Sequence, residues 1–199
     1  MPEAYTGPKF KTMFKNRDPV RDRRLAELAA WGRQFAEHGL TPGAGLAQAG
    51  NLSIRTEPGF IITAAGADLA SLSDNDYIQV LEVNTRKRII FAQGPREPSS
   101  ESFLHAAVYQ QRPEINAVLH GHDDLILRYY IELELPATAM AQPYGSLELM
   151  REIQKVLGDQ TFIVIREHGF LALGETLDQA GEEALRHHDA ALSLSRSAL

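Results

Sequence analysis

The chain has 199 residues, of which 44% are hydrophobic and 23% charged, and its formal net charge is −6. This length and balance are typical of one globular domain with a sizeable core, and they exclude the composition of a disordered chain. The small excess of acidic residues indicates no general affinity for nucleic acid or for an anionic membrane. The absence of cysteine excludes disulfides, thiolate metal sites and a cysteine nucleophile.

The N-terminal region indicates where the domain begins and in which compartment the protein is found. It contains no apolar run of the secretory type, and no stretch of the chain approaches the ~20 apolar residues of a membrane span. We therefore expect a soluble, cytoplasmic protein. Residues 1–18 are basic and lack hydrophobic periodicity, which predicts a flexible arm or one that docks on a neighbouring subunit. The single domain is then expected at 19–199.

The first half of the domain is predicted to open with a helix and continue with strands. Apolar residues recur at helical spacing from Val20 to His38, and Gly39 ends that helix. Alternation and turn residues then predict short strands at 52–55, 60–63, 77–83 and 88–91.

In the second half, helices and strands alternate. Ser100 is the expected N-cap of a helix that runs to Gln111, and Thr176 with Gln179 forms the expected capping box of the last helix. Between them we expect strands at 117–119 and 161–166 and helices at 123–132 and 146–157. Because tight turns join several strand pairs, the sequence predicts one α/β domain with a mainly antiparallel sheet between helices.

Three histidines lie where two predicted strands end. His120 and His122 are two residues apart, so both imidazoles project from one face of a strand, and His168 follows the apolar strand 161–166. If the two strands are neighbours, the three imidazoles converge. Three nitrogen ligands and an open fourth position are typical of a catalytic zinc site, and neutral imidazole also suits cobalt or manganese. On spacing alone, separate histidines with ordinary hydrogen bonds are an equally good interpretation.

The remaining histidines favour structural roles. His38 lies at a helix end, where a cation is favourable. His187 and His188 are adjacent on an amphipathic helix and cannot share a face. His105 follows Glu101 by four residues, and we interpret it as a support that orients this carboxylate.

Four short motifs extend this interpretation to almost the whole chain. They are Gly50-Asn51-Leu52-Ser53, Pro98-Ser99-Ser100-Glu101 with His105, His120-Gly121-His122, and Glu167-His168-Gly169 with Gly174. In this order and spacing they resemble the class II aldolase/adducin family, over roughly residues 20–195. That family includes fuculose-phosphate and rhamnulose-phosphate aldolases, ribulose-phosphate 4-epimerase and methylthioribulose-phosphate dehydratase. The resemblance implies a class II aldolase-like three-layer fold.

The resemblance also implies an activity. One divalent metal per subunit, usually zinc, is expected on His120, His122 and His168, with Glu101 as the general base beside or on the metal. The implied reaction is cleavage of a carbon–carbon bond in a sugar or sugar phosphate through a metal-stabilised enediolate. Family enzymes are typically homotetramers with active sites between subunits, which we expect here as well.

Ser99 and Ser100 are candidate ligands for a substrate phosphate, because free amides at a helix start favour an anion. Gly50 and Asn51 could add an amide donor and a side-chain donor, and the resemblance implies that Thr63 and Gly66 belong to a further loop of this site. Two segments depart from the family pattern, because Ala65 replaces the usual hydroxyl residue and 47–49 contains no serine or threonine. Simple helix capping is the alternative interpretation of Ser99 and Ser100.

The strip from Pro136 to Tyr144 distinguishes one reaction of the family from another. Aldolases commonly have a tyrosine proton donor there, at the position of Met140, whereas the dehydratases have a glutamate nearby. Tyr144 is our candidate proton donor. The alternatives are an epimerase, a dehydratase or a decarboxylase on the same metal site. A non-catalytic, adducin-like interaction protein is less favoured, because the three histidines and Glu101 are all present.

Overall fold

The structure is a computed structural model that describes residues 7–43 and 49–197. Its strands are β1 (Lys11–Asn16), β2 (Asn51–Arg55), β3 (Phe60–Thr63), β4 (Tyr77–Asn84), β5 (Ile89–Gln93), β6 (Ala117–Gly121), β7 (Phe162–Ile165) and β8 (Gly169–Gly174). Its α-helices are α1 (Leu25–Glu37), α2 (Ser102–Gln111), α3 (Asp124–Tyr129), α4 (Leu147–Val156) and α5 (Leu177–Ser197). Short 3-10 helices cover Leu69–Ser71 and Asp74–Asp76.

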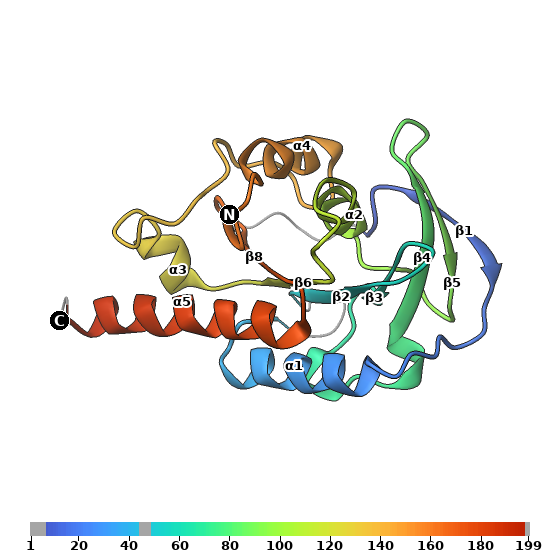
Figure 1. Cartoon of the computed structure of the whole chain (residues 1–199), viewed down its shortest axis with the longest axis horizontal. Helices are drawn as coiled ribbons and strands as arrows, with labels where there is room; N and C mark the ends of the chain where they lie inside the picture. The colour runs from blue at the N-terminus through green and yellow to red at the C-terminus, as the bar shows by residue number, and fades with distance from the viewer. Residues whose placement is uncertain (1–6, 44–48, 198–199) are drawn as a thin grey trace.

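The described strands form one eight-stranded sheet in the order β1-β5-β4-β3-β2-β6-β8-β7. All neighbouring pairs are antiparallel except β1 and β5, which run parallel. Helices α1 and α5 lie along one face of the central strands, and α2 and α4 lie along the other (Figure 1). The predicted three-layer α/β fold with a mainly antiparallel sheet is confirmed.

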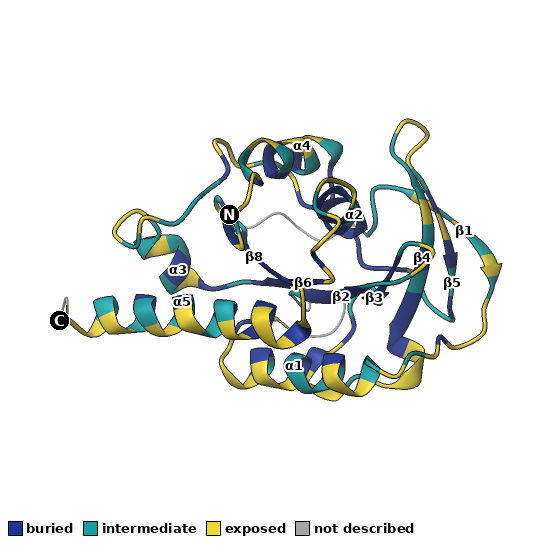
Figure 2. Ribbon diagram, in the orientation of Figure 1, coloured by how far each residue is buried: buried dark blue, intermediate teal, exposed yellow. Residues whose placement is uncertain are grey.

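Two hydrophobic cores fill the space on either side of the sheet, because successive strand side chains point to opposite faces. Leu52 and Ile54 of β2 belong to the core between the sheet and helices α1 and α5. Val118 of β6 belongs to the other core, together with Phe103 of α2 and Ile153 of α4. Accordingly, the central strands are buried and the outer sides of the helices are exposed (Figure 2). The residues of β2 and β6 that lie between these core residues point to the opposite face of the sheet, toward α2, where the candidate site lies.

The N-terminal segment differs from the expected arm. Lys11–Asn16 forms an edge strand that pairs with β5, so the interpretation as a flexible arm is corrected for these six residues. Its side chains alternate between exposed and half-buried, and its partner strand begins more than 70 residues later. Residues 1–6 lie outside the described residues, and docking of 1–18 on a neighbouring subunit stays a prediction.

Helix starts show which capping signals the fold uses. The amide of Gln179 donates to the Thr176 hydroxyl and the amide of Thr176 to the Gln179 side chain, which confirms the predicted capping box. Ser100, in contrast, does not cap α2, which begins at Ser102. The hydroxyl of Ser99 accepts a hydrogen bond from the Glu101 amide instead. The helix therefore starts later than predicted, with Glu101 at the N-cap position.

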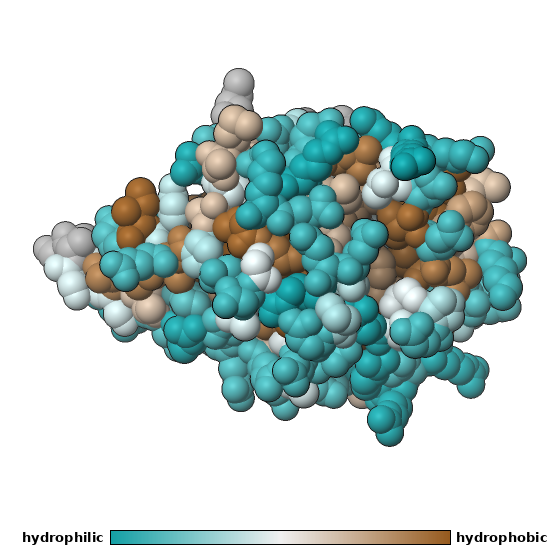
Figure 3. Space-filling model, turned by 45° about the horizontal axis from the view of Figure 1, so that its top comes forward, coloured by the Kyte–Doolittle hydropathy of each residue, from teal (hydrophilic) through white to brown (hydrophobic). Residues whose placement is uncertain are grey.

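The molecular surface is mainly hydrophilic on the face shown in Figure 3, with smaller apolar areas between the polar side chains. The large hydrophobic residues that the structure shows as exposed are Met13, Phe91, Ile131 and Met140. Within 7–43 and 49–197, no helix is long and apolar enough to cross a membrane.

Candidate metal centre

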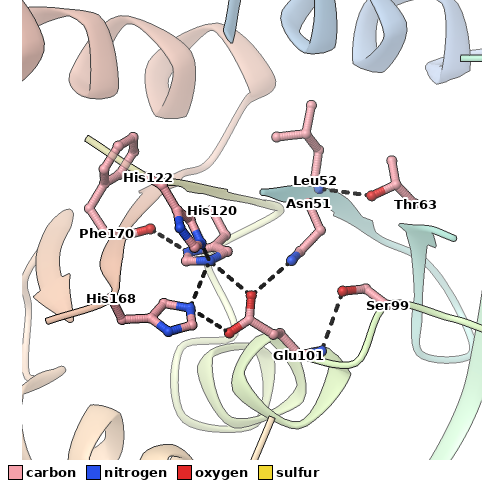
Figure 4. Close-up of polar contacts among 9 residues, drawn as sticks. All are labelled: Asn51, Leu52, Thr63, Ser99, Glu101, His120, His122, His168 and Phe170. Carbon is pink, nitrogen blue, oxygen red and sulfur yellow. Dashed lines mark hydrogen bonds and ion pairs between the residues drawn. The ribbon is translucent and has the colours of Figure 1, made fainter. Parts of the chain in front are cut away.

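The three predicted histidines meet at one end of β6. His120 is in β6, His122 follows it, and His168 lies in the turn between β7 and β8. His168 reaches the site because β8, which begins at the next residue, pairs with β6. The Nε2 atom of His120 lies 3.0 Å from Nε2 of His122 and 3.3 Å from Nε2 of His168 (Figure 4).

Two glycines allow this close approach of β6 and β8. A Cβ atom on Gly169 would lie 2.3 Å from the Gly121 carbonyl oxygen, and one on Gly121 would lie 2.6 Å from the Phe170 ring. The neighbouring Glu167 adopts φ 60°, a left-handed conformation that costs energy for any residue with a side chain. The histidine cluster is thus formed by backbone geometry that larger residues at 121 and 169 would disrupt.

Glu101 completes the cluster from the start of α2. Its Oε2 atom lies 2.8 Å from Nε2 of His120, and its Oε1 atom lies 3.0 Å from Nε2 of His168. The side-chain amide of Asn51 donates a hydrogen bond of 3.0 Å to Oε2 (Figure 4). The ligand atoms of Glu101 and the three histidines all lie within 4.8 Å of one another. Glu101 and His120 are buried, whereas His122 and His168 are partly exposed, so solvent reaches the site from their side.

The orientation of His120 directs a lone pair toward the centre of the cluster. Its Nδ1 atom lies 2.7 Å from the Phe170 carbonyl oxygen, which can only accept, so Nδ1 carries the proton. When His120 is neutral, as a metal ligand must be, Nε2 carries the lone pair and faces the other ligand atoms; when it is protonated, Nε2 donates to the Glu101 carboxylate instead. A hydrogen bond of this kind is the usual support of a metal-binding histidine.

Electrostatics favour an ionised Glu101 carboxylate and a neutral His122 imidazole. Burial opposes ionisation of Glu101, but the charges and hydrogen bonds of His120 and His168 hold the pKa of this carboxyl well below its usual range. Burial, together with His120 and His168, lowers the pKa of His122 to about 3. A carboxylate and imidazole lone pairs that converge on one point form a donor set for a cation.

The distances fit a divalent metal ion. Zinc–nitrogen bonds of ~2.0–2.1 Å at tetrahedral angles separate neighbouring nitrogens by about 3.3 Å, close to the two observed separations. Three nitrogens and one carboxylate oxygen suit zinc, and they also suit cobalt or manganese. His120, His122 and His168, with Glu101 beside them, would hold this ion.

Comparison with known proteins places this site in a family. Residues 26–192 match the family model described as Class II Aldolase and Adducin N-terminal domain. The chain belongs to the class II aldolase/adducin family. The resemblance predicted from the four motifs is therefore confirmed, as is the predicted enzyme class, a class II aldolase-type lyase.

Individual relatives within the family have different names. A 5-methylthioribulose-1-phosphate/5-deoxyribulose-1-phosphate aldolase of Rhodospirillum rubrum is 30% identical over 163 residues, which cover 74% of this chain and 69% of that protein. A methylthioribulose-1-phosphate dehydratase of Klebsiella pneumoniae is 36% identical over 100 residues, 50% of this chain and 45% of the relative. The solved structure of L-fuculose-1-phosphate aldolase from Thermus thermophilus has a TM-score of 0.71 at 24% identity, covering 89% of this chain and 96% of that one. This last likeness shows the common fold.

Several of the candidate phosphate ligands contact residues of the candidate metal centre, as Asn51 and Ser99 contact Glu101. The Thr63 hydroxyl accepts from the Leu52 amide, and the Thr63 carbonyl accepts from the Ser99 amide. The Ser99 hydroxyl accepts from the Glu101 amide, so the hydroxyls of both Thr63 and Ser99 keep a hydrogen that can be donated to an anion. Asn51, Thr63, Ser99 and Ser100 are buried, and Gly50 and Gly66 have positive φ angles. The phosphate-binding role of this set stays a prediction.

Two predicted side chains make contacts that the sequence did not indicate. The Tyr144 hydroxyl donates to the Gly7 carbonyl, and the Lys9 ammonium lies 4.1 Å from the Tyr144 ring centroid. Its role as a proton donor stays a prediction. His105, which we expected to orient Glu101, hydrogen-bonds to Ser53 through Nδ1.

Proposed function

We propose that this protein is a divalent-metal-dependent lyase that cleaves a carbon–carbon bond in a sugar phosphate, with Glu101 as the general base. One observation carries this proposal. The Glu101 carboxylate contacts the Nε2 atoms of both His120 and His168, so a proton carrier lies directly beside the metal ligands. Similarity to named aldolases, from Rhodospirillum rubrum for example, supports the same reaction.

The reaction leaves negative charge on the fragment that keeps the carbonyl group. A divalent cation, when bound, supplies Lewis-acid stabilisation of that charge. As the bond breaks, the ionised Glu101 carboxylate takes up the proton of the hydroxyl group whose oxygen becomes the carbonyl of the released aldehyde. It then delivers that proton to the carbon that carried the broken bond, and the reverse reaction runs the same transfers backwards. The lowered pKa keeps Glu101 in the ionised form that removes a proton. Its hydrogen bond from Asn51 and its contacts with two imidazoles hold the carboxylate in one orientation.

A phosphate group on the substrate is supported by less direct observations than the metal site. Thr63 and Ser99 offer hydroxyl donors, and both hydroxyls are hydrogen-bonded to backbone amides of residues beside or in the metal centre. An anion among buried donors gains charge-assisted hydrogen bonds of about 1.5–3 kcal/mol each. We therefore favour a phosphorylated substrate over a free sugar. The ion we expect is zinc, and the assembly we expect is a homotetramer with sites between subunits.

A dehydratase is the second candidate, supported by the similarity to methylthioribulose-1-phosphate dehydratases. Both reactions use a metal that polarises a carbonyl group and a carboxylate that moves a neighbouring proton. The strip from Pro136 to Tyr144 contains no carboxylate, which favours the aldolase. The products distinguish the two reactions. Cleavage of a ketose 1-phosphate yields a triose phosphate and an aldehyde, whereas dehydration yields water and one product that keeps all the carbon atoms.

The test is an assay of the zinc-loaded protein with L-fuculose 1-phosphate, 5-deoxyribulose 1-phosphate and 5-methylthioribulose 1-phosphate. We expect release of dihydroxyacetone phosphate from at least one of them, abolished in His122→Ala. Arg151→Ala is a matched control on the surface of α4, where it should leave the rate unchanged. Loss of water without triose phosphate would establish the dehydratase. No turnover of any of the three by a protein that holds its metal would contradict the proposal.

A further inference from the structure

Strand β2 and helix α2 face each other through polar rather than apolar side chains. Asn51, Ser53 and Arg55 alternate along β2 and project toward α2, about 6.7 Å apart for each two-residue step. Glu101, His105 and Tyr109 recur every four residues along α2 and its N-cap, about 6 Å apart. Because the two spacings nearly match, each polar residue of the strand meets one of the helix.

The contacts form three successive pairs, which we call the polar ladder. Asn51 donates to Glu101 at 3.0 Å, and the Ser53 hydroxyl lies 2.6 Å from Nδ1 of His105. An Arg55 Nη2 atom donates to the Tyr109 carbonyl at 3.0 Å, with its guanidinium 4.7 Å from the ring centroid. The Ser53 hydroxyl also lies 2.7 Å from the Tyr109 hydroxyl, which links the second pair to the third.

The ladder lies inside the protein, where polar groups are costly. Ser53 and His105 are fully buried, beside the apolar core that includes Phe60 and Val108. Buried polar groups lower stability unless they are hydrogen-bonded, and apolar residues in the same space would pack the helix equally well. What hydrogen bonds add to apolar packing is direction, since their strength falls steeply with misalignment. The ladder therefore fixes how far α2 slides and rotates on β2.

This position matters because the first pair belongs to the metal centre. Asn51 of β2 is the direct partner of His120 in the pairing of β2 with β6. The start of α2 is thus held against the strand that carries a central ligand. We propose that the polar ladder positions the Glu101 carboxylate, with Ser53 and His105 as positioning residues that act through α2 and β2 without touching substrate or metal. This inference rests on the proposed place of Glu101 beside the metal.

The experiment uses Co²⁺ alone as the probe, followed by its visible absorption during titration of metal-free protein. Ser53→Ala and His105→Leu each remove the second pair, whereas His105→Asn keeps a hydrogen-bonding group near the position of Nδ1. Glu101→Gln gives the spectrum expected when the carboxylate is altered. Val108→Ala is the matched control, because it loosens the same helix from the apolar core without touching the ladder.

We expect Ser53→Ala and His105→Leu to shift the cobalt band toward that of Glu101→Gln and to weaken binding at least fivefold. His105→Asn should recover most of the wild-type band, and Val108→Ala should keep it while lowering the unfolding midpoint. The inference is overturned if Glu101→Gln shifts the band and the Ser53 and His105 variants do not, or if Val108→Ala shifts it equally. A wild-type protein that takes up no cobalt overturns the proposed function itself. Should Ser53→Ala not fold, the pair His105→Leu and His105→Asn decides alone.

Discussion

The buried imidazole of His105 makes stability depend on pH in a way that one substitution removes. Burial, and to a smaller extent the charge of His120, lowers the pKa of His105 from 6.5 to about 3 in the folded protein. In the unfolded chain the imidazole takes up a proton near pH 6.5, and in the folded protein it does not. Because the folded pKa is the lower one, the stabilisation is fully present above about pH 6.5 and is lost as the pH falls toward 3.

The magnitude follows from the two pKa values. Each pH unit below 6.5 costs up to ~1.4 kcal/mol for one proton, which amounts to about 2 kcal/mol between pH 8 and pH 5. This figure hardly depends on the folded pKa as long as that pKa stays below about 4. His105→Asn retains a hydrogen-bonding group for Ser53 but has no proton to gain.

The assay is urea unfolding of metal-free wild type and His105→Asn at pH 5, 6, 7 and 8. We expect wild type to be the more stable protein at pH 8 and its advantage to shrink by about 2 kcal/mol at pH 5. Contributions from the rest of the chain are common to the two proteins and cancel in the difference. Parallel stability curves for the two proteins would refute the reasoning, because they would mean that the folded protein protonates His105 as readily as the unfolded chain.

Three further predictions concern the site. Glu101→Gln should lower kcat by about 10²–10⁴-fold while zinc stays bound, and an unchanged kcat would exclude Glu101 as the base. Gly169→Ala places a methyl group against the Gly121 carbonyl, so a chelator competition should show zinc affinity at least tenfold weaker; wild-type affinity would mean that β6 and β8 tolerate separation. Glu167→Gly relieves the left-handed strain at φ 60° and should raise the free energy of unfolding of metal-free protein by about 0.5–1 kcal/mol in urea, whereas a loss would contradict the strain.

Local sequence signals predicted the parts of the site that lie close together in the chain. The two-residue spacing of His120 and His122 placed both on one face of β6, and the capping box of Thr176 and Gln179 opened α5 as expected. His168 was assigned to the same site because it follows an apolar strand. Its approach, however, depends on the pairing of β6 with β8, which periodicity alone does not specify.

Features that depend on distant contacts were missed for the same reason. Lys11–Asn16 is a strand only because β5 supplies its hydrogen-bond partners, and its exposed lysines, Lys11 and Lys15, resemble those of a solvated arm. The role of His105 depends on Ser53, about 50 residues earlier. The two-residue spacing from Asn51 to Ser53 and the four-residue spacing from Glu101 to His105 were nevertheless visible in the sequence. Taken together, these two spacings would have indicated a strand and a helix paired by polar side chains.

Metal content of the purified protein, measured by elemental analysis for wild type beside His122→Ala, tests the central claim most directly. His122 is partly exposed and its ring contacts His120 and His168, so its removal takes one ligand from the centre. We predict about one zinc, cobalt or manganese ion per wild-type chain and a large loss in the variant. A wild-type protein that contains no such metal, and takes none up when zinc is added, would contradict the account.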